Sequence, residues 1–329
     1  MRIGNNDVDG ADRKALDKAV TKLWVGMGKE LERFLDTVGP SQPSAPIYHY
    51  TTAAGLQGIA DECAIFLTDA SYLSDKTELR YGRELISEIL TERKDRASGA
   101  LGAFYRERLA TFDPFSGHFR ATYYVASFCE RSDLLSQWRT YGDESAGFAL
   151  GFPAETFVSG GQIMTLAPEA SALHRIEYVR ETQKQIISHV LQCCEESFLR
   201  DIGQATNVHD ERILDASYFG LFMLQLASLL PQFKHPMFHE EREWRLTLSR
   251  MREGDDELVD FRALGKDLLP FVRFPLKLPN GLLPLCEIVV SPANEPALQS
   301  RTVRKLLRRK QYPEGSVKVV EPEIPLEFR

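Results

Sequence analysis

The chain has 329 residues, of which 43% are hydrophobic and 26% are charged, as in globular proteins and unlike disordered or fibrous ones. Its net charge of -7 argues against binding nucleic acid over a broad surface, although a local basic pocket stays compatible with it. No uncharged stretch approaches the roughly 20 apolar residues of a membrane span, and the first residues lack the apolar run of a secretory signal. We therefore expect a cytoplasmic protein that makes no contact with a membrane.

Cysteine and histidine spacing gives no sign of a metal site. The five cysteines are odd in number and have no ligand spacing, which predicts buried small side chains in a reducing compartment. His235 and His239 are four residues apart, as in some helical zinc sites, but Pro236 between them argues against a regular helix. A P-loop, a dinucleotide-binding glycine fingerprint and a nucleophile elbow are also absent from the sequence. We expect no metal.

Two parts of the chain are separated by a linker rich in proline. Apolar residues at helical spacing predict one amphipathic helix over residues 12–38, and Gly39 and Pro40 end it. This helix could pack on the main domain or mediate self-association. We therefore divide the chain into an N-terminal helix and linker, residues 1–45, and a single domain, residues 46–329.

The domain combines short strands with irregularly placed helices. Strands are predicted at 47–52, 63–68, 121–129, 147–152, 174–179, 285–291 and 317–320, with a further strand emerging within 238–248. A helix is predicted to start at Asp75, which with Glu78 fits an acidic capping box, and to run to about residue 93. Further helices are predicted at 97–112, 181–202, 210–230 and 297–310, and a short one follows Thr52. The regular alternation of a doubly wound sheet is missing, so the pattern indicates an α+β fold.

His49 is the first candidate site residue. It lies near the end of the first predicted strand, and a threonine after it is placed to cap the helix that follows. A histidine at such a boundary is held by a rigid element and still faces open space, as a site residue should.

Three later segments supply possible partners. In a strand, Glu241, Glu243 and Arg245 would share one face and form either a surface salt-bridge ladder or a polar site. Ser127 ends the strongest strand and could be a site hydroxyl or an ordinary strand-end residue. Trp138, beside Arg139, could be core packing or a ligand platform.

These segments together resemble the domain of unknown function 2971 family, whose members have no established activity. The resemblance spans roughly residues 46–310. The matching motifs are Tyr48-His49-Tyr50-Thr51, Leu73-Ser74-Asp75-x-x-Glu78, Ala126-Ser127-Phe128-Cys129-Glu130, Gln137-Trp138-Arg139-x-Tyr141-Gly142, Gly147-Phe148-Ala149-Leu150-Gly151-Phe152, Glu241-x-Glu243-x-Arg245 and Ile288-Val289-Val290-Ser291-Pro292. The family usually has Asn at the position of Ser74 and often Ser at that of Cys129.

The opening strand and helix also look more distantly like those of ADP-ribosyltransferase domains. This resemblance implies a mixed, mostly antiparallel split sheet with peripheral helices, and NAD as the substrate that is consumed. It implies a site made of a histidine on the first strand, a Ser, Thr or Tyr at a middle strand, and a Glu or Gln on a later strand. His49, Ser127 and Glu243 stand in those places in that order.

The resemblance also implies roles for these residues. Glu243 would stabilise the oxocarbenium-like state formed when the bond between ribose and nicotinamide breaks, and Glu241 would orient or activate the acceptor. His49 would hold a ribose hydroxyl, and the adjoining Tyr50 would stack on nicotinamide. The remaining cofactor-binding candidates are Thr51, Ser127 and, for the pyrophosphate, Arg139 or Arg245.

The function expected on this basis is transfer of ADP-ribose from NAD to a protein or nucleic acid acceptor, with toxin or phage-defence systems as frequent settings. Two alternatives stay open. One is a sensor that binds a nucleotide or a nucleic acid end without turnover. The other is a metal-free hydrolase or nuclease in which Glu241 and Glu243 act as acid and base.

Overall fold

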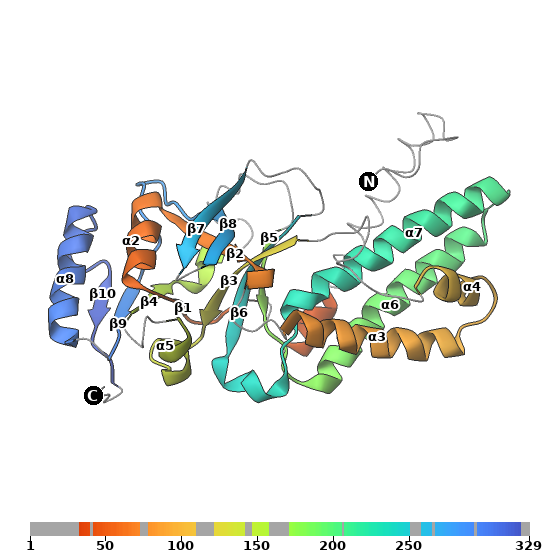
Figure 1. Ribbon diagram of the computed structural model, residues 1–329, viewed down its shortest axis with the longest axis horizontal. Coiled ribbons are helices and arrows are strands. Elements are labelled where there is room, and N and C mark those ends of the chain that lie inside the picture. The colour runs from red at the N-terminus through yellow and green to blue at the C-terminus, as the bar shows by residue number, and fades with distance from the viewer. Residues whose placement is uncertain are drawn as a thin grey trace.

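The computed structural model of the protein has a sheet region at one end and a helical bundle at the other (Figure 1). It describes residues 33–39, 42–72, 78–109, 122–141, 147–157, 171–205, 207–250, 258–264, 267–292 and 295–323. The sheet region carries α8 at its outer edge, and the bundle is formed by α3, α4, α6 and α7.

The described residues form ten named strands and a set of helices. The strands are β1 (Ile47–Thr51), β2 (Ala64–Asp69), β3 (Thr122–Cys129), β4 (Phe148–Phe152), β5 (Ser171–Arg175), β6 (Glu243–Arg250), β7 (Val259–Leu264), β8 (Asp267–Pro275), β9 (Glu287–Val290) and β10 (Lys318–Val320). The α-helices are α2 (Ala53–Glu62), α3 (Glu78–Arg96), α4 (Gly99–Glu107), α5 (Leu135–Tyr141), α6 (Arg180–Ile202), α7 (Val208–Leu229) and α8 (Pro296–Arg309). Short 3-10 helices include η3 (Leu230–Gln232) and η4 (Pro236–Glu241).

The strands join in one mixed sheet. Its main path runs β10-β9-β4-β1-β3-β2-β8-β7. Off this path, β6 pairs with β3, and β5 pairs with β6. The pairs are antiparallel except for β9 with β10. The α+β class and the mostly antiparallel sheet with peripheral helices are thus confirmed.

Strand β3 is the centre of this arrangement. Strand β6 pairs with it over its full length, from Thr122 to Cys129. Strands β1 and β2 therefore share the other edge of β3: β1 pairs at Cys129, and β2 pairs at Tyr124 and Val125. Between these pairings the two strands separate, and the edge of β3 at Ser127 lies between them.

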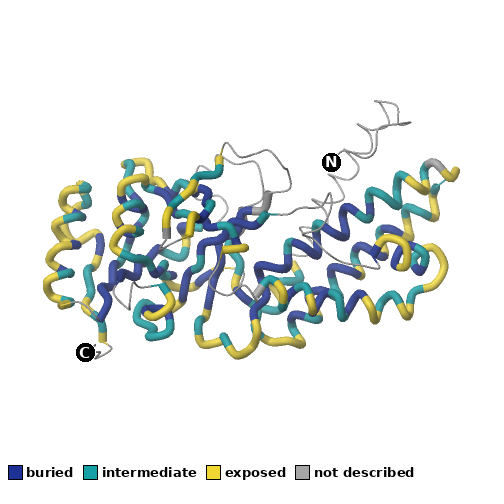
Figure 2. The backbone as a smooth tube through the Cα atoms, viewed as in Figure 1, coloured by how far each residue is buried: buried dark blue, intermediate teal, exposed yellow. Residues whose placement is uncertain are grey.

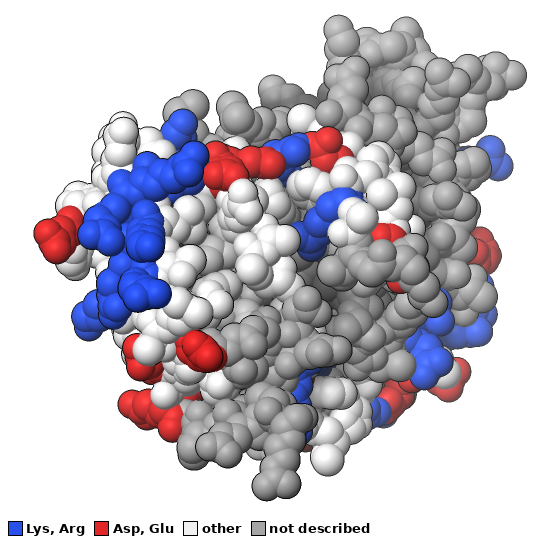
Figure 3. Space-filling view, turned by 60° about the vertical axis from the view of Figure 1, so that its left-hand side comes forward, with Lys and Arg blue, Asp and Glu red and all other residues white. Residues whose placement is uncertain are grey.

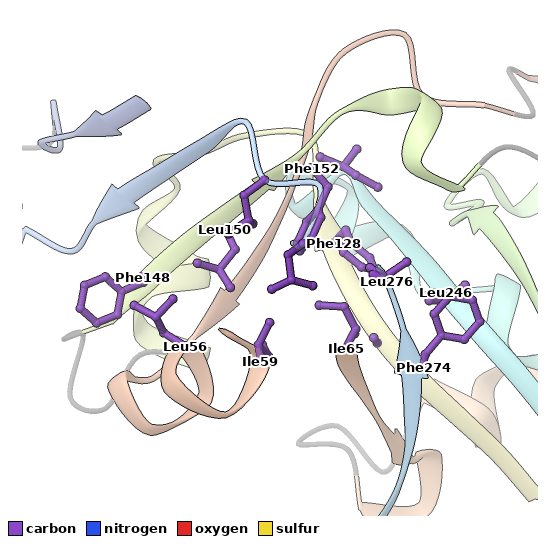
Figure 4. Packing of buried hydrophobic residues seen from close by; sticks show 14 of the residues in the cluster. Leu56, Ile59, Ile65, Phe128, Phe148, Leu150, Phe152, Leu246, Phe274 and Leu276 are labelled. Carbon is purple, nitrogen blue, oxygen red and sulfur yellow. The ribbon is translucent and has the colours of Figure 1, made fainter. Parts of the chain in front are cut away.

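Two large apolar cores hold the molecule together. The sheet core gathers residues from β1, β2, β3, β4, β6, β8 and β9 with Leu56 and Ile59 of α2, and the labelled side chains converge in Figure 4. The second core lies inside the bundle, where Phe198, Phe222 and Leu226 are buried, as the inner faces of the helices show in Figure 2. Burial of this kind is the main stabilising term in folding.

The turn from β1 into α2 forms for local reasons that the sequence reveals. The Thr52 side chain caps the helix by accepting from the Gly55 amide at 3.1 Å, as expected. The helix ends at Cys63, which adopts a left-handed conformation with φ of 49°. A Cβ added at Gly55 would lie 2.0 Å from Thr51 Oγ1, so a residue without a side chain is needed there.

Most of the predicted elements are found, with four differences. Strand β5 lies at Ser171–Arg175, earlier than the predicted 174–179. Strands β7 and β8 were not predicted at all. Strand β6 begins at Glu243, because the preceding residues form η4 and Arg242 adopts a left-handed conformation. The prediction that Glu241 lies on this strand is therefore wrong. Of the N-terminal helix, residues 33–38 are helical, while its earlier part and Asp75 lie outside the described residues.

Candidate functional site

His49 lies where β1 and β2 separate along β3. Its Nδ1 is 2.9 Å from the carbonyl oxygen of Ser127. A carbonyl can only accept, so Nδ1 carries the proton and Nε2 of the neutral ring is left as an acceptor. The ring also packs against Phe128, with centroids 5.5 Å apart.

The surroundings of His49 keep it neutral. Burial lowers its pKa to about 4, the hydrogen bond to Ser127 partly offsets this, and the charge of Arg262 lowers it further. The ring is therefore uncharged at neutral pH. His49 can therefore accept a hydrogen bond through Nε2.

Arg262 approaches this point from β7, on the far side of the separation. Its Nη2 donates to Thr68 Oγ1 at 2.7 Å, and its guanidinium lies over the rings of Phe66 and Phe271 at 5.9 and 5.6 Å. Its Nε is buried and has no hydrogen-bond partner within the described parts of the chain. Burial also lowers the pKa of Arg262. We call His49, Ser127 and Arg262 the junction site.

Glu243 stands at the start of β6 in a buried ionic cluster. Arg245 donates to both of its carboxylate oxygens, at 2.6 and 2.9 Å, and Lys234 Nζ lies 3.2 Å from Oε2. Lys234 also bonds Glu241 at 2.7 Å, so it bridges the two carboxylates. Lys234, Glu243 and Arg245 are each at most 3% exposed, which makes this cluster part of the interior.

The Ser127 hydroxyl completes this cluster through a hydrogen bond to Glu243. Burial alone would raise the pKa of Glu243, but the charges of Arg245 and Lys234, with the hydrogen bonds from Arg245 and Ser127, outweigh it and lower the pKa. A carboxylate held in its ionised form can stabilise positive charge but cannot serve as a general acid. In the hydrolase alternative, Glu243 could therefore act only as the base.

The candidate residues divide between the two faces of the sheet. Tyr48, Cys129 and Glu243 stand directly opposite one another on three strands, so they share a face. The alternation of a strand directs His49 to the other face, where Leu150 stands opposite it. Ser127 joins the two sides, through its backbone to His49 and through its hydroxyl to Glu243. The structure thus links the predicted set through Ser127, but it does not arrange His49 and Glu243 on one face.

The remaining predicted residues have other neighbours. Tyr50 is 4% exposed, meets the Trp138 ring edge-on at 4.6 Å and bonds Arg131 and Leu134 through its hydroxyl, so packing accounts for it. Trp138 is fully buried, so it is a core residue and not a platform for a ligand. Arg139 is exposed on α5. Thr51 is partly buried beside Gly55 at the start of α2.

A polar network ties the ionic cluster to the bundle. Arg245 Nη1 donates to the Pro231 carbonyl at 3.3 Å, and the Glu243 amide donates to Tyr178 Oη at 3.0 Å. Gln183 of α6 is buried and donates to the carbonyl of Lys234 at 2.9 Å, and Tyr81 of α3 donates to Gln183 at 2.7 Å. The cluster therefore connects the sheet to two helices of the bundle.

Two of these residues were missed by sequence reasoning. Arg262 lies on β7, a strand that the sequence did not predict, although Val259, Phe261 and Ala263 alternate with polar residues as in a half-buried strand. Lys234 is a single charge between apolar residues after a long helix, and no motif marks it.

Metal ligands and membrane helices were also sought among the described residues. No three His, Cys, Asp or Glu side chains gather there as they would around an ion. Residues 210–232, which include most of α7, are long and apolar enough to cross a membrane. More than half of that apolar stretch is buried against the rest of the protein, as in the core helix of a bundle.

Comparison with known proteins finds a family whose profile matches part of the chain. The profile of the family described as Protein of unknown function (DUF2971) matches residues 137–246, which run from α5 to the first residues of β6. No curated protein and no solved structure matches the chain. The predicted resemblance to the DUF2971 family is therefore confirmed for residues 137–246.

Proposed function

We propose that the protein binds a nucleotide at the junction site, with NAD as the first ligand to test. The observation that carries this proposal is a guanidinium whose Nε is buried and has no partner among the described residues. It lies near enough to the neutral His49 for its charge to lower the pKa of that ring. A buried donor without a partner costs roughly 1–3 kcal/mol, so such groups call for an explanation.

An anionic ligand explains both side chains. A phosphate group would accept from the free Nε of Arg262, and a ribose hydroxyl would donate to Nε2 of His49. Phe66, which is half-buried beneath the guanidinium, offers an aromatic ring next to these polar groups. A nucleotide combines phosphate, sugar hydroxyls and an aromatic base, so it suits this combination better than a simple anion does.

Calorimetric titration with NAD, ADP-ribose, ATP and pyrophosphate tests this proposal. Arg262→Gln removes the charge, and His49→Asn keeps a donor toward Ser127 while removing Nε2. Both variants should weaken nucleotide binding at least about tenfold, the equivalent of one lost hydrogen bond to a charged group. Arg273→Gln is the matched control, because Arg273 also lies over Phe271, at 5.3 Å, but is exposed and pairs with Glu62 and Asp260.

Binding that is equal in all three variants would place the ligand elsewhere. If the wild-type protein bound none of the four compounds, the proposal would fall.

ADP-ribosyl transfer is the second candidate, and the role of Ser127 favours it. One residue contacts both His49 and the ionised carboxylate of Glu243, which is the type of group that can stabilise an oxocarbenium-like state. Against it, strand alternation directs the two side chains to different faces, and Arg245 and Lys234 already neutralise the carboxylate.

Nicotinamide release from NAD separates the two candidates. A transferase should release nicotinamide in the presence of cell extract. Glu243→Gln should abolish the release while leaving NAD binding in place, in protein that circular dichroism shows to be folded. Tight binding of NAD with no more nicotinamide than buffer alone would support a sensor and exclude transfer.

A further inference from the structure

The exposed side of α8 is strongly basic although the protein is acidic. Six basic residues occur between positions 301 and 310, and no acidic residue occurs between Pro296 and Pro313. The basic residues are Arg301, Arg304, Lys305, Arg308, Arg309 and Lys310. Figure 3, which brings this end of the molecule forward, shows Lys and Arg side chains gathered in one group there. We call these six residues the α8 basic face.

The helix presents these charges on one side because its other side is buried. Ser300, Val303 and Leu307 are at most 9% exposed and pack toward the sheet. Arg301, Lys305 and Arg308 follow at intervals of four and three residues, so they lie along one exposed stripe. Residues 301 and 305 are about 6 Å apart along the helix axis, and residues 305 and 308 about 4.5 Å, since each residue adds about 1.5 Å.

Few of these charges are used within the protein. Lys310 pairs with Asp61 at 2.6 Å, and Arg304 donates to the Val319 carbonyl at 3.3 Å. Arg301, Lys305 and Arg308 form no ion pair within the described segments. A row of like charges repels itself, so its retention on one face is explained most simply by an anionic partner.

We propose that the α8 basic face binds the phosphodiester backbone of a nucleic acid. The backbone offers a regular row of single negative charges, which matches a row of cations on a rigid helix. An anionic membrane is a weaker match, because membrane-surface helices insert an apolar side and that side of α8 is buried against the sheet. Contact is through charge alone, so binding is independent of base sequence.

The helix is held firmly enough to act as a docking surface. Strand β10 follows it and pairs in parallel with β9, which precedes it. The hydrogen bond from Arg304 to Val319 and the ion pair from Lys310 to Asp61 add contacts to β10 and α2. The basic face therefore keeps its orientation relative to the sheet.

Fluorescence anisotropy with a labelled DNA duplex, and with single-stranded DNA and RNA of the same sequence, tests this proposal. The test variant is Arg301→Gln with Lys305→Gln and Arg308→Gln. The control removes the same charge from exposed residues of the bundle, Arg96→Gln with Arg106→Gln and Arg212→Gln. Circular dichroism checks that both proteins are folded, and Arg301→Lys with Arg308→Lys should bind as the wild type does.

The expected result is nucleic acid binding that falls with salt in the wild type and in the control. The test variant should bind at least about tenfold more weakly at low salt, and the slope of log affinity against log salt should shrink by about 3. The proposal is overturned if the wild type binds none of the three nucleic acids, or if the control loses as much affinity as the test variant. It is also overturned if phosphatidylserine vesicles bind more tightly than nucleic acid and only that binding depends on α8.

This inference does not depend on the junction site. The triple α8 variant should bind nucleotides at the junction site as the wild type does, so the two proposals can fail separately.

Discussion

The His49 imidazole donates to the Ser127 carbonyl oxygen at 2.9 Å, at the point where β1 leaves the edge of β3. The His49 side chain thus donates to a backbone carbonyl of β3 that accepts no ladder hydrogen bond from β1 or β2. Because Ser127 also bonds Glu243, this hydrogen bond is the structural connection between the junction site and the ionic cluster.

Protonation of histidine should make the protein less stable in mild acid. Burial lowers the pKa values of His49 and His174 to about 4, against about 6.5 in an unfolded chain. As pH falls from 6.5 toward 4, the unfolded state therefore binds protons that the folded state does not. Stability is complete above pH 6.5 and is lost across this window, by up to about 1.4 kcal/mol per pH unit for each histidine.

Urea denaturation at a series of pH values measures this loss. His49→Asn keeps a donor toward Ser127 but cannot titrate, so its stability should fall about half as steeply as that of the wild type. An unchanged slope in both His49→Asn and His174→Asn would show that these residues do not cause the effect.

Removing one member of the ionic cluster should strongly destabilise the fold. Arg245→Met leaves the Glu243 carboxylate buried with less compensation, at a cost of about 3–5 kcal/mol. Replacing both residues, as Arg245→Met with Glu243→Leu, should recover part of this loss. Arg200→Met is the control, since the exposed pair of Arg200 with Asp201 should contribute less than about 1 kcal/mol. Equal effects of Arg245→Met and Arg200→Met in urea denaturation would contradict the burial argument.

Arg262 should behave differently from Arg245 although both are arginines on strands. Arg262→Met removes a buried Nε donor that has no partner in the described chain, which should stabilise the fold. It also removes the hydrogen bond to Thr68, which should destabilise the fold. We expect the free energy of unfolding to change by less than about 1 kcal/mol, with loss of nucleotide binding. A loss as large as that of Arg245→Met would make Arg262 a structural residue.

Gly55→Ala should destabilise the turn from β1 to α2, since the new Cβ would approach Thr51 Oγ1 to 2.0 Å. We expect the melting temperature to fall by several degrees, in line with about 1–3 kcal/mol for an overpacked site. Thr51→Ala in the same chain removes the hydroxyl and should restore most of the loss. Failure of this second change to help would mean that the backbone at position 55, rather than the side-chain clash, sets the effect.

The sequence predicted elements that carry a strong local signal. Strand β3 is rich in aromatic and β-branched residues, and the threonine before α2 does cap that helix. Strand β8 was missed because Pro270 and Pro275 argue against a strand. Pro270 is tolerated because it pairs only with Phe261 of β7, beyond the end of the pairing with β2, and Pro275 is the last residue of the strand.

The candidate site was predicted less well, for reasons that lie in tertiary structure. Residue types and chain order indicated His49, Ser127 and Glu243, and the three are joined through Ser127. Their distribution over two faces depends on the register of β1 with β3, which is set by the pairing of Tyr48 with Cys129. The same applies to Lys234, which only the packing of η3 against β6 brings to Glu243. No local pattern contains either relationship.

The two ends of the sheet's main path differ in how readily they could recruit another chain. At one end, β10 is only three residues long and exposes Lys318, and both features discourage pairing with another strand. At the other end, β7 has six residues and exposes Phe261, with Leu268 exposed on the adjacent β8. Aggregation of this protein at high concentration should therefore begin at β7, and a charged residue in place of Phe261 should improve its solubility.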